Sequence, residues 1–190
     1  MSVPLGFRFN AAQFSACVLA ETPAPPYTHV RIAVDPAYFS NATSDQSAIS
    51  TGFQGDDFSF TLLDSASGRW KGIELPNRIV TAIETWDPYE VWIERTGNGA
   101  PDMLVDVIKM ECELKGIRIP QITFFTPSES KADRVFKLQA LVESQQLHIC
   151  PGTFTSTLIQ QARDFTFTQT NSRREDGCLD SLAAVCGFKN

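Results

Sequence analysis

The chain has 190 residues, of which 43% are hydrophobic, and its formal net charge is −6. This length and composition predict one domain with one substantial core, and they exclude a protein coated in positive charge, so any contact with nucleic acid must come from local basic patches. The five cysteines show neither CxxC pairing nor zinc-ligand spacing, which predicts reduced thiols, and no apolar run is long enough to span a membrane.

Residues 1–28 show no clear periodicity and end in a proline-rich stretch, Glu21–Thr28. Such a stretch is expected to be extended and rather stiff, which predicts a linker or N-terminal extension. A linker at the front of a chain is typical of a protein in which another domain precedes it. Residues 29–190 are then predicted to form the folded domain.

The first predicted strand covers residues 29–35 and ends in a carboxylate, Asp35, with Pro36 directly behind it. Valine and isoleucine favour a buried strand, and proline cannot continue the hydrogen-bonded ladder. A carboxylate at the end of a buried strand must be solvated, paired or bound to a cation. Asp35 is therefore a candidate metal ligand. The alternative is that it only caps a turn before the proline.

An antiparallel meander is predicted next. Residues 45–53 and 58–62 alternate apolar and polar side chains, with a turn at residues 54–57 between them. A second turn is predicted at residues 65–68, followed by a further strand over residues 69–74.

The remaining chain alternates helices and strands. A second short buried strand, Val91–Glu94, again ends in an acid. The other predicted elements are a helix from Pro76 to Trp86, a helix from Pro101 to Gly116 with Leu104, Val107, Ile108 and Leu114 on its buried side, a strand over Ile119–Phe125, and helices beginning near Ser130 and Thr155. This alternation implies parallel strands with helices packed on the sheet faces.

The last motif contains two acids, Asp176 and Asp180, four residues apart. On a helix, this spacing places both carboxylates on one face, one turn from each other. They could bind a metal there. Alternatively, Asp176 is an N-cap and Asp180 is a solvated first-turn acid that suits the helix dipole.

Five short segments follow one another in a fixed order: Val34–Ala37, Ser44–Ile49, Trp92–Gly99, Ser130–Val135 and Asp176–Leu182. Together they resemble the C-terminal nuclease domain of the large terminases of tailed bacteriophages, over roughly residues 31–187. The resemblance implies an α/β ribonuclease H-like fold. Its central mixed sheet would combine an antiparallel meander with parallel strands and carry helices on both faces.

Two departures from the family pattern matter. The last motif often reads DDxxDA, whereas here Gly177 replaces the second acid and Ser181 replaces the alanine. This difference favours Asp176 as the direct ligand and leaves the role of Asp180 open. The chain also contains no GxxxxGK[ST] phosphate loop, so the resemblance implies a nuclease half without the ATPase motor.

The resemblance implies an endonuclease that hydrolyses phosphodiester bonds of double-stranded DNA with two Mg²⁺ or Mn²⁺ ions. Asp35, Glu94 and Asp176 are the predicted catalytic ligands, with Asp35 shared by both ions. Asp180 and Asp45 would be further ligands or outer acceptors. The implied partners are DNA, the terminase ATPase domain, the portal and the small terminase subunit, in the cytoplasm of the host cell.

Four basic residues are predicted to contact the DNA backbone with little sequence preference: Lys131, Arg134, Arg173 and Arg174. The first two begin a helix and the other two flank the final acids. The alternative is that they lie on a solvated helix face, as most lysines and arginines do. Arg134 could also pair with an acid near Asp133 or at the edge of the core.

Two other functions remain open. The chain could be another ribonuclease H-like nuclease, such as a junction resolvase or an RNA-strand hydrolase. It could also be a non-catalytic DNA-binding or docking module in which the acids are only caps. A Glu94→Ala variant separates catalysis from binding, since only a nuclease would lose Mn²⁺-dependent plasmid nicking.

Overall fold

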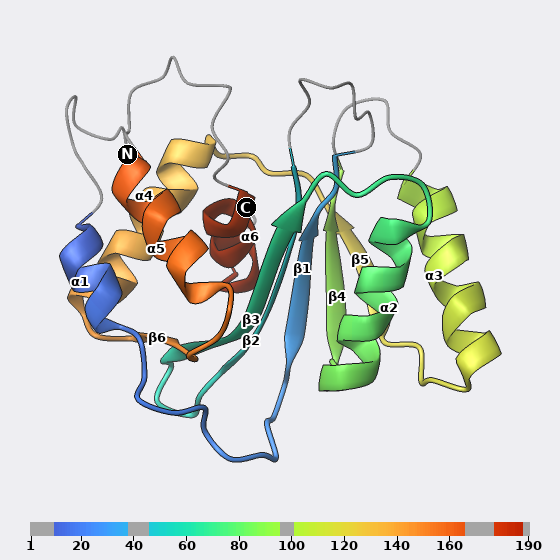
Figure 1. The fold of residues 1–190 in the computed structure, drawn as a ribbon, viewed down its shortest axis with the longest axis horizontal. Coiled ribbons are helices and arrows are strands. Elements are labelled where there is room, and N and C mark those ends of the chain that lie inside the picture. Colours follow the sequence, from blue (N-terminus) through green and yellow to red (C-terminus); the bar gives the residue numbers. More distant parts are fainter. Residues whose placement is uncertain (1–9, 38–45, 96–100, 166–176, 188–190) are drawn as a thin grey trace.

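A mixed six-stranded sheet separates two groups of helices in the computed structural model of the chain, which describes residues 10–37, 46–95, 101–165 and 177–187 (Figure 1). The strands are β1 (Arg31–Asp35), β2 (Ser47–Gln54), β3 (Phe60–Gly68), β4 (Glu90–Glu94), β5 (Gln121–Phe125) and β6 (Leu147–Ile149). The helices are α1 (Ala11–Ala16), α2 (Glu74–Trp86), α3 (Pro101–Lys115), α4 (Lys131–Glu143), α5 (Thr155–Asp164) and α6 (Gly177–Val185).

The strand order is β5-β4-β1-β2-β3-β6. β1, β2 and β3 form an antiparallel meander, whereas β4 is parallel to β1 and to β5, and β6 is parallel to β3. This confirms the predicted mixed sheet. Because β1 and β4 are parallel neighbours, with Val34 opposite Ile93, their C-terminal ends lie together at one edge of the sheet.

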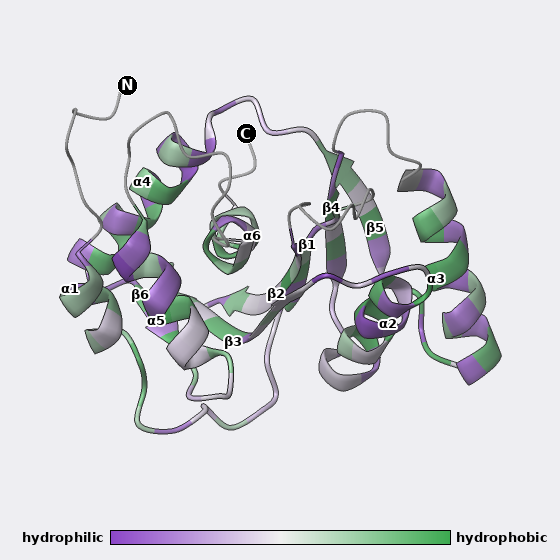
Figure 2. Ribbon diagram, turned by 45° about the horizontal axis from the view of Figure 1, so that its top comes forward, coloured by the Kyte–Doolittle hydropathy of each residue, from purple (hydrophilic) through white to green (hydrophobic). Residues whose placement is uncertain are grey.

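Helices cover both faces of the sheet, as predicted (Figure 1). α2 and α3 pack on one face, where α2 presents a helical stripe containing Ile79, Val80 and Ile83, each at most 1% exposed. α1, α4, α5 and α6 pack on the other face around a second core that includes Leu138 and Leu179. α3 carries both green and purple residues, as expected for a helix with one buried and one exposed side (Figure 2).

The meander differs from the prediction in its third strand. Residues 65–68, predicted as a turn, continue β3, and residues 69–73 connect it to α2 instead of forming a strand. The serine-rich composition suggested a turn. In the fold, however, β2 pairs with this stretch as far as Gly68, and the Ser65 hydroxyl lies 3.0 Å from the Ser50 hydroxyl.

The buried side of α3 was also partly mispredicted. Leu114, expected in the core, is 75% exposed. The buried positions are Leu104, Val105, Ile108 and Cys112. Because each residue of a helix turns by about 100°, Leu114 lies on nearly the opposite side from Cys112.

The helix α1 lies within the segment predicted as a linker. Its Phe14 is fully buried in the core, and Leu19 donates a backbone hydrogen bond to the Ile149 carbonyl. A helix of one and a half turns with a single buried residue is too short to produce a helical pattern of apolar residues in the sequence. That residues 20–28 connect to a further domain stays a prediction. No described helix is both long and apolar enough to cross a bilayer.

Candidate active site

Asp35 and Glu94 lie side by side at one edge of the sheet. Each ends a strand with three buried residues, and the two strands are parallel neighbours. The apolar run fixes each strand in the core, and the acid is the first residue to reach the edge. The carboxylates of two segments 59 positions apart are thus brought together, as the sequence predicted.

The third acid, Asp180, is supplied by α6. This helix packs across β1 and β2 and is buried along its whole length. Its rotation is fixed by two polar contacts: the Ser181 hydroxyl lies 2.7 Å from the Ser50 hydroxyl, and the Leu179 N–H donates to Oε1 of Gln161 at 3.3 Å. These contacts aim Asp180 at the strand ends.

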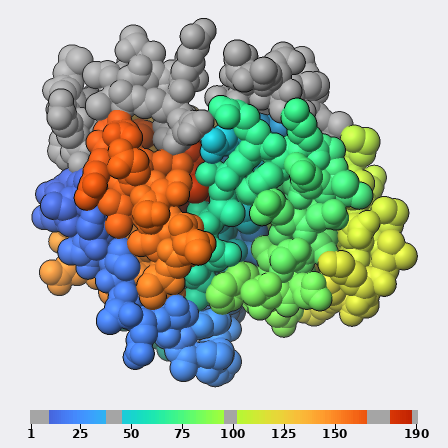
Figure 3. All heavy atoms as spheres, in the orientation of Figure 1, coloured from blue at the N-terminus to red at the C-terminus, as the bar shows by residue number. Residues whose placement is uncertain are grey.

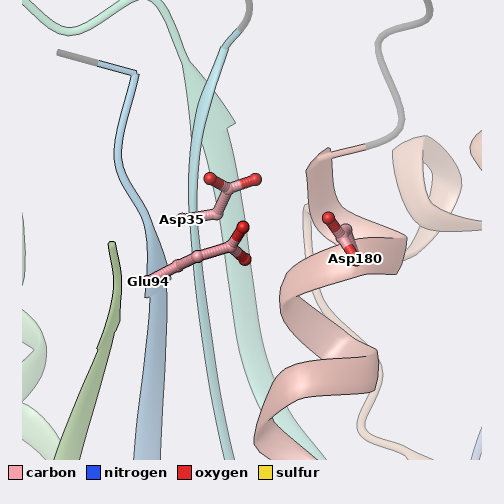
Figure 4. Close-up of side chains that lie close together, drawn as sticks. All are labelled: Asp35, Glu94 and Asp180. Carbon is pink, nitrogen blue, oxygen red and sulfur yellow. The ribbon is translucent and has the colours of Figure 1, made fainter. Parts of the chain in front are cut away.

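The three acids form a compact cluster. One carboxylate oxygen from each of Asp35, Glu94 and Asp180 lies within 4.8 Å of the other two. Figure 4 shows the two strand acids pointing toward Asp180 on the helix. A site made only of carboxylate oxygens suits hard cations such as Mg²⁺ and Mn²⁺. The donor set therefore fits the predicted metal.

A buried arginine partly neutralises the cluster. Arg134 of α4, only 4% exposed, donates from Nε and NH2 to Oδ1 of Asp180 at 3.0 and 2.6 Å, and from NH2 to Oδ2 at 2.7 Å. The same NH2 lies 3.8 Å from Glu94, and NH1 donates to the Glu129 carbonyl. This forked contact holds the Asp180 carboxylate in place.

Burial and the neighbouring charges act on Glu94. Desolvation, together with the carboxylates of Asp35 and Asp180, raises the pKa of Glu94 from 4.5 to about 7, against the opposing effect of Arg134 and Lys131. A divalent cation bound at the cluster would favour the ionised form. In the metal-free protein, Glu94 binds a proton far more readily than an exposed glutamate does.

The stability of the metal-free protein should therefore depend on pH. Between pH 4.5 and about 7 the folded state binds more protons at Glu94 than the unfolded state does. The contribution of Glu94 to the free energy of unfolding is therefore complete below pH 4.5, falls as the pH rises, and is lost above about pH 7. Allowing for solvent screening, the loss is on the order of 2 kcal/mol. Urea unfolding in EDTA at pH 5 to 8 measures it.

Two comparisons test whether Glu94 causes this pH dependence of stability. In Glu94→Gln the fall attributed to this site should disappear, because the amide does not titrate. Saturating Mn²⁺ should raise wild-type stability at pH 8, since the ion takes the place of the proton. Identical pH profiles for wild type and Glu94→Gln would contradict the assignment.

The structure places the other predicted site residues as follows. Lys131 lies at the rim of the cluster, with Nζ 3.7 Å from Oδ2 of Asp180 and its side chain 37% exposed. The Arg134 guanidinium lies among the acids and not on an exposed face. Asp45, Asp176, Arg173 and Arg174 lie outside the described residues.

Sequence reasoning left two features of this site unresolved. The motif favoured Asp176 over Asp180, yet Asp180 is the acid that the described part of the chain brings to the cluster. The sequence left open that Arg134 pairs with an acid, but it did not identify Asp180, 46 residues later, as the partner, since no local spacing indicates it. The one available signal was the helical position of Arg134, four residues before the buried Leu138.

Known structures share this architecture. No protein-family model and no curated protein sequence matches the chain. The human cytomegalovirus terminase nuclease domain, Mn soaked and inhibitor bound, matches with a TM-score of 0.68 at 10% identity, over 96% of this chain and 95% of that chain. The P22 large terminase nuclease domain matches with a TM-score of 0.68 at 12% identity, over 95% and 90%.

A junction-cutting enzyme also matches. The yeast mitochondrial Holliday junction resolvase gives a TM-score of 0.56 at 13% identity, over 88% of this chain and 80% of that chain. At these identities the likeness establishes the fold. The chain has the ribonuclease H-like fold of these nucleases, as predicted from the sequence.

Proposed function

We propose that this chain, whose fold is that of terminase nuclease domains, is a metal-dependent endonuclease that cuts double-stranded DNA during viral genome packaging. The observation that carries the proposal is the convergence of three carboxylates from β1, β4 and α6. A buried cluster of like charges destabilises a fold, and a bound divalent cation offsets that cost. Such a cluster in a nuclease fold favours a catalytic role of the three carboxylates over a purely structural one.

The residues of the cluster have distinct roles in this proposal. Two Mg²⁺ or Mn²⁺ ions would neutralise the attacking and leaving oxygens of the phosphodiester and lower the pKa of the attacking water. Asp35, Glu94 and Asp180 would hold the ions, and Asp176 remains a proposed further ligand. Arg134 would keep the Asp180 carboxylate oriented, acting as a positioning residue.

DNA contacts are proposed around the same edge of the sheet. Lys131, half-exposed at the rim of the cluster, is suited to a phosphate of the bound strand. Arg173 and Arg174 are proposed backbone contacts from their position in the sequence. The ATPase domain, portal and small terminase subunit are proposed partners, and the host-cell cytoplasm is the proposed location.

A second candidate function is junction resolution, because a Holliday junction resolvase shares the fold. The terminase nuclease domains match with a higher TM-score, 0.68 against 0.56, and over more of this chain. The likeness in shape therefore favours an enzyme acting on ordinary duplex DNA.

One assay tests both candidates. Supercoiled plasmid and a synthetic four-way junction are incubated with the protein in Mn²⁺, in Mg²⁺ and in EDTA. We expect nicking and linearisation of the plasmid with either metal, no cleavage in EDTA, and no preference for the junction over a linear duplex of equal length. Symmetric cuts at the junction alone would favour the resolvase function, and no cleavage of any substrate would contradict the proposal.

A further inference from the structure

A cleft of about 240 Å³ opens beside α6, the helix that carries Asp180. Its walls include residues 65–67 of β3, Trp70, Arg78 of α2, Thr157 of α5 and Cys178 of α6. In the space-filling view, the hollow lies between the orange α5 and the green connection from β3 to α2, with red α6 at its floor (Figure 3). None of the residues of the acid cluster lines this cleft.

The cleft and the acid cluster lie on two sides of the same helix. Cys178 lines the cleft and Asp180 belongs to the cluster, and two residues on a helix point about 200° apart. Across the sheet, Ser67 pairs with Ala48, which pairs with Asp35. Two strand spacings separate Ser67 from Asp35, which is roughly 10 Å.

The chemistry of the cleft is that of an anion site. Of the lining residues that the structure describes, Arg78 is the only charged one and none is a carboxylate. Among the described residues, no acid forms an ion pair with this exposed arginine. Its guanidinium carbon lies 4.8 Å from the centre of the Trp70 ring, which orients it. This is a local positive site on a chain with a net charge of −6.

The indole ring of Trp70 packs against Gly68, the last residue of β3. A Cβ atom at Gly68 would lie 2.5 Å from the indole Nε1, so the ring packs against the backbone where a side chain would otherwise stand. The Arg78 guanidinium therefore stacks on an indole ring whose position is fixed. A pre-oriented guanidinium loses less freedom on binding a phosphate than a mobile one does.

The cleft also follows the open edge of β3. β6 pairs with β3 only over Phe60–Leu62, and no other described strand pairs on that side. Three consecutive residues, 65–67, line the cleft although their side chains alternate between the sheet faces, so the cleft runs along the strand edge. The hydroxyl groups of Ser67 and Thr157 add hydrogen-bonding groups there.

We propose that this cleft binds the phosphodiester backbone of the DNA strand close to the bond that is cut. A guanidinium fork with hydroxyl groups suits a phosphate. The strand position of Ser67 lies roughly 10 Å from that of Asp35, so one bound DNA strand can reach both. The inference rests on the proposed nuclease function and adds a second point of contact that sets the register of the strand.

The test compares Arg78→Ala with a matched control, Arg118→Ala. Arg118 is also an exposed arginine, but it bonds to Asp87 before the start of β4, at the opposite end of the sheet from Asp35. Binding of a fluorescent 30-base-pair duplex is followed by anisotropy in Ca²⁺ at several salt concentrations. Plasmid cleavage in Mn²⁺ gives kcat and KM, and a thermal melt checks folding.

We expect Arg78→Ala to weaken duplex binding about fivefold to tenfold and to lower the salt slope by about 0.9, the value for one phosphate contact. KM should rise by a similar factor, while kcat changes less than about twofold, because the residue touches no reacting atom. Arg78→Lys should recover the salt slope but only part of the affinity. Arg118→Ala should match wild type throughout.

The outcomes separate the two proposals. Equal binding and equal salt slopes for Arg78→Ala and wild type would overturn the cleft assignment while leaving the nuclease intact. Absence of cleavage by wild type would overturn the nuclease function, yet a selective binding loss in Arg78→Ala would still support the cleft as a DNA site. A wild-type protein that neither binds nor cuts DNA would overturn both.

Discussion

Replacing Asp35 with asparagine should reduce Mn²⁺-dependent DNA cleavage at least about a hundredfold, the largest effect on activity expected for this protein. Loss of groups that only orient metal ligands already costs tenfold to a hundredfold, roughly, and Asp35 is placed to contact the ion itself. The asparagine keeps the size of the side chain but removes the charge. The measurement is the initial rate of plasmid nicking across Mn²⁺ concentrations.

Stability distinguishes lost chemistry from lost folding. Since Asp35 raises the pKa of Glu94 by repulsion, Asp35→Asn should be at least as stable as wild type in EDTA, and Mn²⁺ should stabilise it less. The matched control is Asp56→Asn, at an exposed position of the turn between β2 and β3. It should cut at the wild-type rate. An Asp35→Asn protein that nicks DNA as fast as wild type would rule out the metal site.

Replacing Arg134 with methionine should have the largest effect on stability, a loss of about 3 to 5 kcal/mol in EDTA. The Arg134 and Asp180 side chains are each 5% exposed and the guanidinium donates three hydrogen bonds to the carboxylate. Removing the arginine leaves Asp180 buried beside two other acids with its main counter-charge gone. Urea unfolding at pH 7.5 measures the change.

Mn²⁺ should restore a larger part of the stability of Arg134→Met than it adds to wild type, because the ion supplies the missing positive charge. Arg118→Met is the matched control. Its ion pair with Asp87 has a similar 2.6 Å contact, but the side chains are 54% and 77% exposed. Its loss should cost at most about 1 kcal/mol. Equal destabilisation by both substitutions would show that the buried Arg134–Asp180 pair stabilises the fold no more than the exposed Arg118–Asp87 pair does.

The sequence alone determined the elements and much of the site. Short apolar runs ending in Asp35 and Glu94 predicted both the strands and the position of the acids at their ends, because an apolar run favours burial and a carboxylate favours the edge of the core. Helical spacing identified most of the helices. Prediction was poor where local signals were weak, as in α1, whose single buried residue, Phe14, has no periodic companions.

Only the tertiary structure decided which groups meet. Asp180 joins the cluster because α6 is packed across the sheet and rotated by the contacts of Ser181 and Leu179, contacts that no local pattern encodes. Arg134 pairs with that acid for the same reason. Local sequence sets the backbone preference of each segment, whereas the choice between a solvated and a buried charge depends on neighbours that are distant along the chain and are brought close by the packing of the core.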